Sequence, residues 1–172
     1  MVSFLDHSSN KIWLHLAIKS KRGFKRHLTI LNILNRRAKM ILTGGCYCKE
    51  LRYSSLGNIT ASIQCHCREC IYFTGGNANT SIIVPIETFK FSKGTPKSYE
   101  RHDIKNPVIR LFCKTCGTVI GTKSPRRLNS INLKVGTLDN PSIFKPETAI
   151  FTDDKQDFHH IADHVDQFAK RP

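Results

Sequence analysis

Seven cysteines, all between positions 46 and 116, constrain this 172-residue chain more than any other feature. They fall in three segments, GGCYCKE, QCHCREC and FCKTCG, with the spacings C-x-C, C-x-C-x-x-C and C-x-x-C. An odd number of cysteines cannot pair completely in disulfides, whereas thiols one or two residues apart can converge on one metal ion. The pattern therefore predicts metal binding in a reducing compartment, and we expect the cytoplasm.

The first and last segments together supply four thiolates, which is the number that a closed tetrahedral zinc site needs. In an extended strand Cys46 and Cys48 would present their sulfurs to the same face. Cys113 and Cys116 flank a tight turn, after which Gly117 can adopt an unusual backbone dihedral. These four cysteines are therefore predicted to hold a structural zinc ion that joins distant parts of the chain.

The middle segment contributes Cys65, Cys67 and Cys70, which would leave one position of a tetrahedral zinc ion open. Three protein ligands with an exchangeable fourth ligand are typical of catalytic zinc. Zinc bound by three thiolates favours deprotonation of an incoming thiol, and the thiolate is the nucleophilic form of sulfur. The three residues thus predict zinc-assisted addition of a thiol to an electrophile.

Three alternatives remain open from the residues alone. The cysteines could be buried and reduced without a metal, or the two sites could exchange ligands. A histidine could also close the three-cysteine site, which would make it a second structural centre. The candidates are His66, His102, His159, His160 and His164. His66 should point away from its two neighbouring cysteines if the backbone there is extended; His66 and His102 are also candidate acid–base groups by residue type.

Basic residues are concentrated at the start of the chain. Residues 1–39 hold nine Lys or Arg and one Asp, so they carry +8 of the formal net charge of +14. We expect them to form a basic N-terminal extension, disordered or partly helical; the alternative is that Met40 is the natural start and that the residues before it are upstream sequence. Residues 40–172 are expected to form one zinc-binding domain. Nucleic acid is the weaker partner expectation, through residues 1–39, and no apolar run approaches the roughly 18 residues of a membrane span.

Beyond Met40 the sequence consists of short runs rich in β-branched and aromatic residues, separated by Gly, Pro, Asn and Ser. Such runs predict an all-β fold of short antiparallel strands joined by turns. Near the end of the chain, Ile161, Val165 and Phe168 lie at i, i+4 and i+7. This spacing predicts a short C-terminal helix.

The segments GGCYCKELRY, CHCREC, FCKTCGT and KVGTLDNPS, in this order, resemble the glutathione-dependent formaldehyde-activating enzyme family, which includes centromere protein V. The resemblance runs from Ile41 to about Phe158 and implies an all-β zinc fold called a β-tent. It also implies two zinc ions per chain, one structural and one catalytic, with the same division of the seven cysteines. One departure is Lys49, which stands where the family usually has glycine.

The implied activity is that of a carbon–sulfur lyase. Such an enzyme joins glutathione or a similar thiol to formaldehyde or another small aldehyde, giving S-(hydroxymethyl)glutathione or its analogue, and catalyses the reverse reaction. The alternative is a non-enzymatic zinc module that binds a macromolecular partner through its basic extension.

Overall fold

The structure is a computed structural model that describes residues 40–172, and the predicted N-terminal extension with its charge-dependent partner lies outside the described residues. The described chain is mostly β, as predicted. Its strands are β1 (Ile41–Gly45), β2 (Arg52–Leu56), β3 (Ala61–Cys65), β4 (Asn79–Pro85), β5 (Phe89–Lys93), β6 (Lys97–Tyr99), β7 (Ile109–Phe112), β8 (Val119–Ser124), β9 (Arg127–Lys134), β10 (Thr148–Ile150) and β11 (Asp166–Phe168). Within residues 40–172, every helix is too short or too polar to serve as a membrane span.

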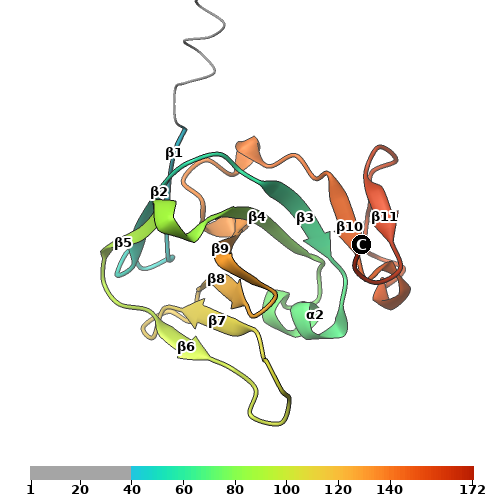
Figure 1. The fold of residues 1–172 in the computed structure, drawn as a ribbon, viewed down its shortest axis with the longest axis horizontal. Helices are drawn as coiled ribbons and strands as arrows, with labels where there is room; N and C mark the ends of the chain where they lie inside the picture. The colour runs from blue at the N-terminus through green and yellow to red at the C-terminus, as the bar shows by residue number, and fades with distance from the viewer. Residues whose placement is uncertain (1–39) are drawn as a thin grey trace, which may run out of the picture. The chain divides into compact units, whose positions relative to one another are not determined.

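The strands form two sheets (Figure 1). One has three antiparallel strands in the order β1-β2-β5, and the other has eight strands in the order β11-β10-β3-β4-β9-β8-β7-β6. β4 lies inside the larger sheet, where the consecutive residues Ile82, Ile83 and Val84 are all buried. A β-branched run of this kind packs on both faces of a pleated strand. Fully buried side chains of β4, β8 and β9 and of the smaller sheet's β2 share one hydrophobic core, namely Tyr53, Ile82, Val84, Ile120, Ile131 and Leu133.

The expectation of antiparallel pairing fails at one edge of the larger sheet. β10 pairs in parallel with both β3 and β11. Parallel neighbours need a long connection between them, and some 80 residues separate β3 from β10. In sequence order, β10 therefore follows every other strand of the larger sheet except β11.

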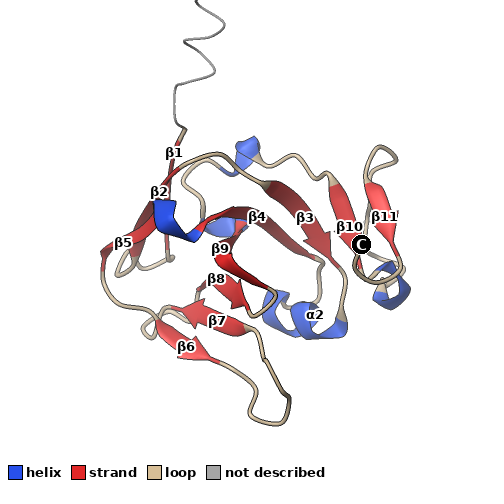
Figure 2. Cartoon of the chain, viewed as in Figure 1, coloured by secondary structure: helices blue, strands red, loops and turns tan. Residues whose placement is uncertain are grey.

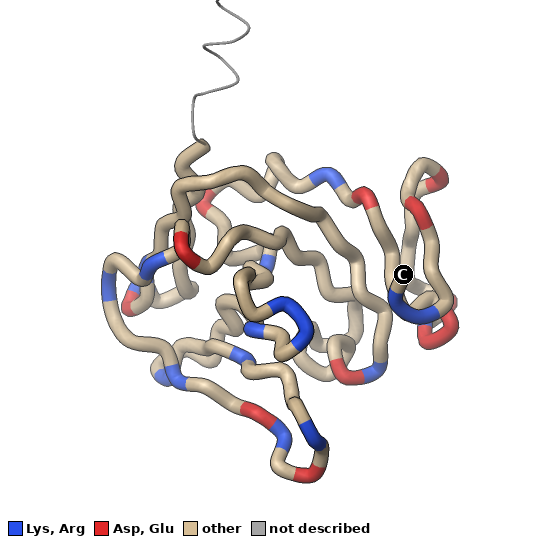
Figure 3. Tube along the Cα trace, viewed as in Figure 1, with Lys and Arg blue, Asp and Glu red and all other residues tan. Residues whose placement is uncertain are grey.

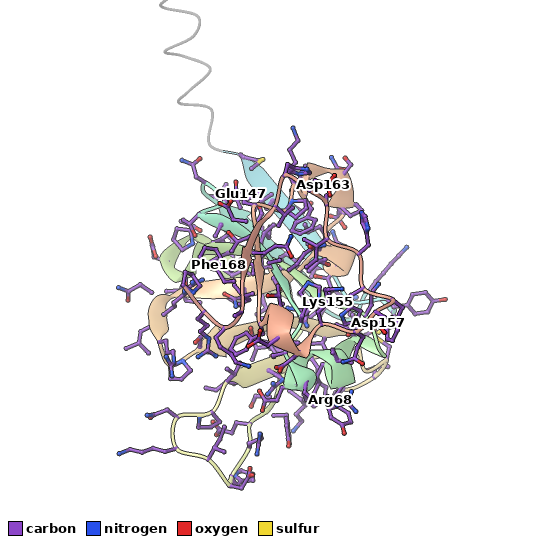
Figure 4. All side chains as sticks on the ribbon, turned by 90° about the vertical axis from the view of Figure 1, so that its right-hand side faces the viewer. Arg68, Glu147, Lys155, Asp157, Asp163 and Phe168 are labelled. Carbon is purple, nitrogen blue, oxygen red and sulfur yellow. The ribbon has the colours of Figure 1, made fainter. Side chains whose placement is uncertain are left out.

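The predicted C-terminal helix is wrong. Residues 166–168 form β11, and the Asp166 amide donates to the carbonyl oxygen of Glu147 at 3.1 Å instead of to a helical partner. Val165 is buried all the same, so its apolar side chain reflects burial without a helix. A helix of this length is marginal on its own, and an unpaired strand edge offers more hydrogen bonds. Figure 4 looks onto this edge, with Phe168 near its middle and Arg68 below it.

An α-helix forms at a place where the sequence pattern predicts none. Helix α2 (Arg68–Thr74) begins directly after Cys67 and contains Cys70 (Figure 2). It ends at Gly75, whose φ of 74° is a left-handed conformation that favours glycine, and the Gly76 amide donates to the Ile71 carbonyl oxygen at 3.1 Å. The helix thereby turns the chain from the end of β3 back to the start of β4.

Candidate metal centres and the adjoining pocket

The first cysteine cluster joins the turn after β1 to the connection between β7 and β8. The sulfur atoms of Cys46, Cys48, Cys113 and Cys116 all lie within 4.8 Å of one another. Cys46 Sγ is 3.5 Å from Cys48 Sγ, which is 3.7 Å from Cys113 Sγ. Four sulfurs this close, two of them buried, match the donor set of a closed tetrahedral zinc site.

Each half of this cluster is shaped by its turn. The prediction that the first pair lies in an extended strand is wrong. β1 ends at Gly45, and the chain then turns, with the Lys49 amide donating to the Cys46 carbonyl oxygen at 3.1 Å. Lys49 has a φ of 64°, which accounts for a preference for glycine at this position. In the second pair Gly117 has a φ of 73°, as expected, and its amide donates to the Cys113 carbonyl oxygen at 2.9 Å.

The second cluster lies where β3 passes into α2. Cys65 ends β3, Cys67 immediately precedes α2, and Cys70 lies in the first turn of the helix. Positions three apart at a helix start lie on the same side, so Cys67 and Cys70 point toward the sulfur at the strand end. The three sulfurs lie within 4.8 Å of one another. Helix α2, which the sequence analysis did not predict, therefore brings the three sulfurs of this cluster together.

The shifted pKa values of the thiols in the second cluster are consistent with a site for a metal cation. Hydrogen bonds from Cys65 and Cys70 lower the pKa of Cys67 to about 2, whereas donating to Cys67 raises the pKa of Cys65. The pKa of Cys70 is raised as well, so the close packing of the three thiols opposes their ionisation together. Three simultaneous thiolates need a positive ion between them, and a soft donor set of this kind suits zinc.

The histidines do not join either cluster. No histidine of residues 40–172 has a ring nitrogen within 4.8 Å of all three sulfurs of the second cluster. His66 points away from its neighbours to His159, with 3.0 Å between the two Nδ1 atoms. His102, His160 and His164 are exposed. The described residues thus divide the cysteines four and three, and the histidine-closed and ligand-exchanged alternatives lack a matching geometry.

The hydrogen bonds of the buried histidine pair settle its tautomers. His159 Nε2 donates to the Gly76 carbonyl oxygen at 2.9 Å, and its Nδ1 accepts from the Gln156 amide at 3.3 Å. His159 Nδ1 is therefore an acceptor, so His66 Nδ1 must be the donor in the 3.0 Å bond. His66 Nε2 is left buried without a partner among the described residues. The pair holds the β3–α2 junction against the C-terminal segment.

A pocket of about 390 Å³ opens beside the second cluster. Cys65, Cys67 and Cys70 line it together with apolar side chains that include Ile63 and Ile150. Its other charged and amide-bearing lining residues in the described part of the chain are Glu69, Asn79, Arg110, Arg126, Arg127, Asn132, Lys134 and Arg171. Figure 3 shows basic positions on the β8–β9 connection and beside the C-terminal end. Apart from the thiols, the pocket is strongly cationic.

A sequence profile described as the glutathione-dependent formaldehyde-activating enzyme family matches residues 41–154, a stretch that includes all seven cysteines. The chain belongs to this family. The profile confirms the resemblance seen in the cysteine segments, while the link to centromere protein V stays a prediction. Family membership supports an activity of the glutathione-dependent, formaldehyde-activating type.

Two further comparisons add less. No curated protein matches the chain significantly. A crystal structure of a Rhodobacter sphaeroides protein is similar with a TM-score of 0.48 and 17% sequence identity, over 59% of this chain and 93% of that chain.

Sequence reasoning in this family member missed the charged residues of the pocket. Lys134 lies at the end of β9 between the buried residues Leu133 and Val135, and burial lowers its pKa. Arg110 is buried on β7. The sequence feature that could have predicted these residues is a lysine or arginine within an otherwise apolar strand, because such a side chain is rarely buried without a partner. The role of the seven cysteines as zinc ligands stays a prediction.

Proposed function

We propose that the chain joins glutathione or a similar thiol to a small aldehyde such as formaldehyde, and catalyses the reverse lyase reaction. The observation that carries this proposal is the cluster of Cys65, Cys67 and Cys70, which faces a pocket and has no histidine of the described residues beside all three sulfurs. These three residues would hold the catalytic zinc ion, and the other four cysteines a structural one. Bound there, zinc would supply stabilisation of an incoming thiol in its thiolate form.

The pocket's own residues fit the rest of such a substrate. Arg126, Arg127 and Arg171 are exposed at the pocket and can donate hydrogen bonds to the carboxylates of an acidic thiol such as glutathione. Ile63, Ile150 and other apolar side chains line the part near the sulfurs and limit the water that reaches a thiolate. The volume of about 390 Å³ lies within the range of small-molecule sites.

A reducing compartment, with the cytoplasm as our proposal, suits this chemistry. All seven cysteines lie in the described part of the chain and are free thiols. Oxidation of any pair within a cluster would remove two ligands at once.

The proposed function is tested by the rate at which glutathione and formaldehyde exchange with their adduct. Thiols add to formaldehyde spontaneously, so the measurement is exchange NMR with and without the zinc-loaded protein. We expect the wild type to accelerate exchange in both directions and Cys67→Ser to leave the spontaneous rate. A wild type that holds two zinc ions and leaves the exchange rate unchanged would contradict the proposal.

A further inference from the structure

Lys134 lines the pocket, and its amine is held by a buried asparagine that a buried serine of the same neighbouring strand holds in turn. Its Nζ donates to Asn79 Oδ1, and Asn79 Nδ2 donates in turn to Ser81 Oγ at 2.8 Å. Ser81 is also the residue paired with Lys134 between β4 and β9. Asn79 and Ser81 are 9% and 4% exposed, so the amine is fixed by the sheet and not by solvent.

The one buried cation among the described residues that line the pocket is held against helix α2. Arg110 donates through Nη2 to Glu69 Oε2 at 3.0 Å and through Nη1 to the Val108 carbonyl oxygen at 3.4 Å. Its guanidinium also stacks on the Phe73 ring at 4.1 Å from the ring centre. Two of its five N–H donors and one face of the guanidinium are therefore committed, and they join β7 to α2.

The amine of Lys134 keeps donors for a ligand. Among residues 40–172, Asn79 is its one hydrogen-bond partner. An ammonium has three N–H donors and a neutral amine has two, so at least one remains after this bond in either protonation state. Lys134 lines the same pocket as the three cysteines. Its remaining donors can therefore serve a substrate in the pocket that the three sulfurs also line.

We propose that Lys134, oriented by Asn79, donates a hydrogen bond to the aldehyde oxygen and is a catalytic residue of the addition. The inference rests on the proposed function of the same pocket. In the product only one carbon atom separates this oxygen from the sulfur, so a group that contacts it must lie beside the sulfur. Of the pocket's cations, the exposed arginines are assigned above to the carboxylates, and Glu69 and Phe73 hold the Arg110 guanidinium toward α2. We therefore assign the contact with the aldehyde oxygen to the Lys134 amine.

The reaction step balances without any further reagent. The thiol loses its proton to solvent and becomes a thiolate, and the sulfur lone pair forms the C–S bond to the carbonyl carbon. The π pair of the carbonyl moves to oxygen, where the Lys134 N–H donor stabilises the developing alkoxide. The alkoxide then takes a proton from water, and in the lyase direction each movement reverses. Donors aimed at a developing oxyanion typically contribute about 10²- to 10³-fold in kcat.

The test compares the zinc-loaded wild type with Lys134→Met, and with Lys123→Met as the matched control. Lys123 is an exposed lysine on the adjacent strand β8 and does not line the pocket. In the exchange assay we expect Lys134→Met to lower kcat by about 10²-fold with little change in the KM for glutathione. The second readout is calorimetric binding of sodium formate, a one-carbon anion that offers its oxygens to the same donor. We expect Lys134→Met to weaken formate binding at least about tenfold, a 1.4 kcal/mol effect, and Lys123→Met to match the wild type in both.

The outcomes separate the two proposals. A wild type without exchange activity contradicts the proposed function, while formate binding that is lost in Lys134→Met still supports a Lys134 oxyanion site. An active Lys134→Met with the wild-type kcat, or one that binds formate as the wild type does, overturns the inference. If Lys134→Met does not fold, Lys134→Arg tests the inference instead. The longer arginine keeps the positive charge but moves the N–H donor away from the position of the lysine amine. Formate should then still bind while kcat falls, and an unchanged kcat again overturns the inference.

Discussion

Cys48 Sγ lies 3.7 Å from Cys113 Sγ, although 65 positions separate the two residues in the chain. This contact brings the turn after β1, in the smaller sheet, to the β7–β8 connection of the larger one. Cys46 and Cys113 also belong to the shared hydrophobic core. A metal ion bound there would therefore stabilise the packing of one sheet against the other.

The two cysteine clusters should respond differently to mutation. Cys113→Ser removes a buried ligand from the four-cysteine cluster, and we expect the protein to unfold or aggregate, because binding energy of a structural zinc ion is also folding energy. Cys67→Ser should give a folded protein with one zinc ion and no zinc-dependent activity. The measurements are thermal unfolding and zinc content per chain. Equal destabilisation of the two variants would mean that the second site is structural as well.

Two arginines that contact the same carboxylate should differ in their effect on stability. Arg110 and Arg101 both donate to Glu69 at 3.0 Å, but the Arg110 side chain is 6% exposed and that of Arg101 is 37% exposed. We expect Arg110→Met to lower the free energy of unfolding by about 2 kcal/mol, since a buried charge-assisted hydrogen bond and the stack on Phe73 are lost. Arg101→Met should lower it by less than about 1 kcal/mol. Urea unfolding measures both, and equal effects would contradict this account of how α2 is held.

Tyr53 should give the fold a pH dependence in the alkaline range. Its hydroxyl donates to Thr137 Oγ1 at 2.9 Å, because the Thr137 hydroxyl hydrogen is used by the Lys134 carbonyl oxygen at 2.8 Å. Burial raises the pKa of Tyr53 from its ordinary value near 10 to about 12. The unfolded chain therefore loses this proton first, so the stabilisation is complete below pH 10 and disappears as the pH rises to 12.

The variant Tyr53→Phe isolates this effect. At pH 8 it should be less stable than the wild type by about 1 kcal/mol, through loss of the hydrogen bond to Thr137. Between pH 8 and pH 11 the wild type should lose about 1.4 kcal/mol more than the variant, the value expected for one group with these two pKa values. Urea unfolding at the two pH values measures the difference. Parallel losses in the two proteins would show that Tyr53 does not titrate as described.

The cysteine groups and most strands could be predicted because their signals are local. Spacing favours a division of the seven thiols into four and three over an exchange of ligands between the sites, and β-branched runs such as the one in β4 predict the strands. Helix α2 escaped prediction because Ile71, Tyr72 and Phe73 resemble a strand and the helix has only seven residues. The apolar spacing of Ile161, Val165 and Phe168 predicted a helix that does not form. The end of this segment pairs instead with the edge strand β10, as β11.

The charged pocket could not be predicted because it depends on tertiary contacts. Lys134 acquires its position from Asn79, which lies on another strand and is 55 positions away in the chain. Arg110 and Glu69 meet across 41 positions. Local sequence patterns do not predict such long-range pairs. The one local indication is a cation between buried apolar neighbours, which suggests that a polar partner lies nearby.

The central claim is that the three-cysteine site holds a metal ion with a position left for a substrate thiol. Its most direct test is a titration of the cobalt-substituted protein with glutathione, followed by visible absorption. We predict that the bands of one site change with glutathione and stay unchanged with S-methylglutathione, which has no thiol, while the four-cysteine site remains constant throughout. A spectrum that does not change at millimolar glutathione would contradict the claim, because the fourth position would then already be filled.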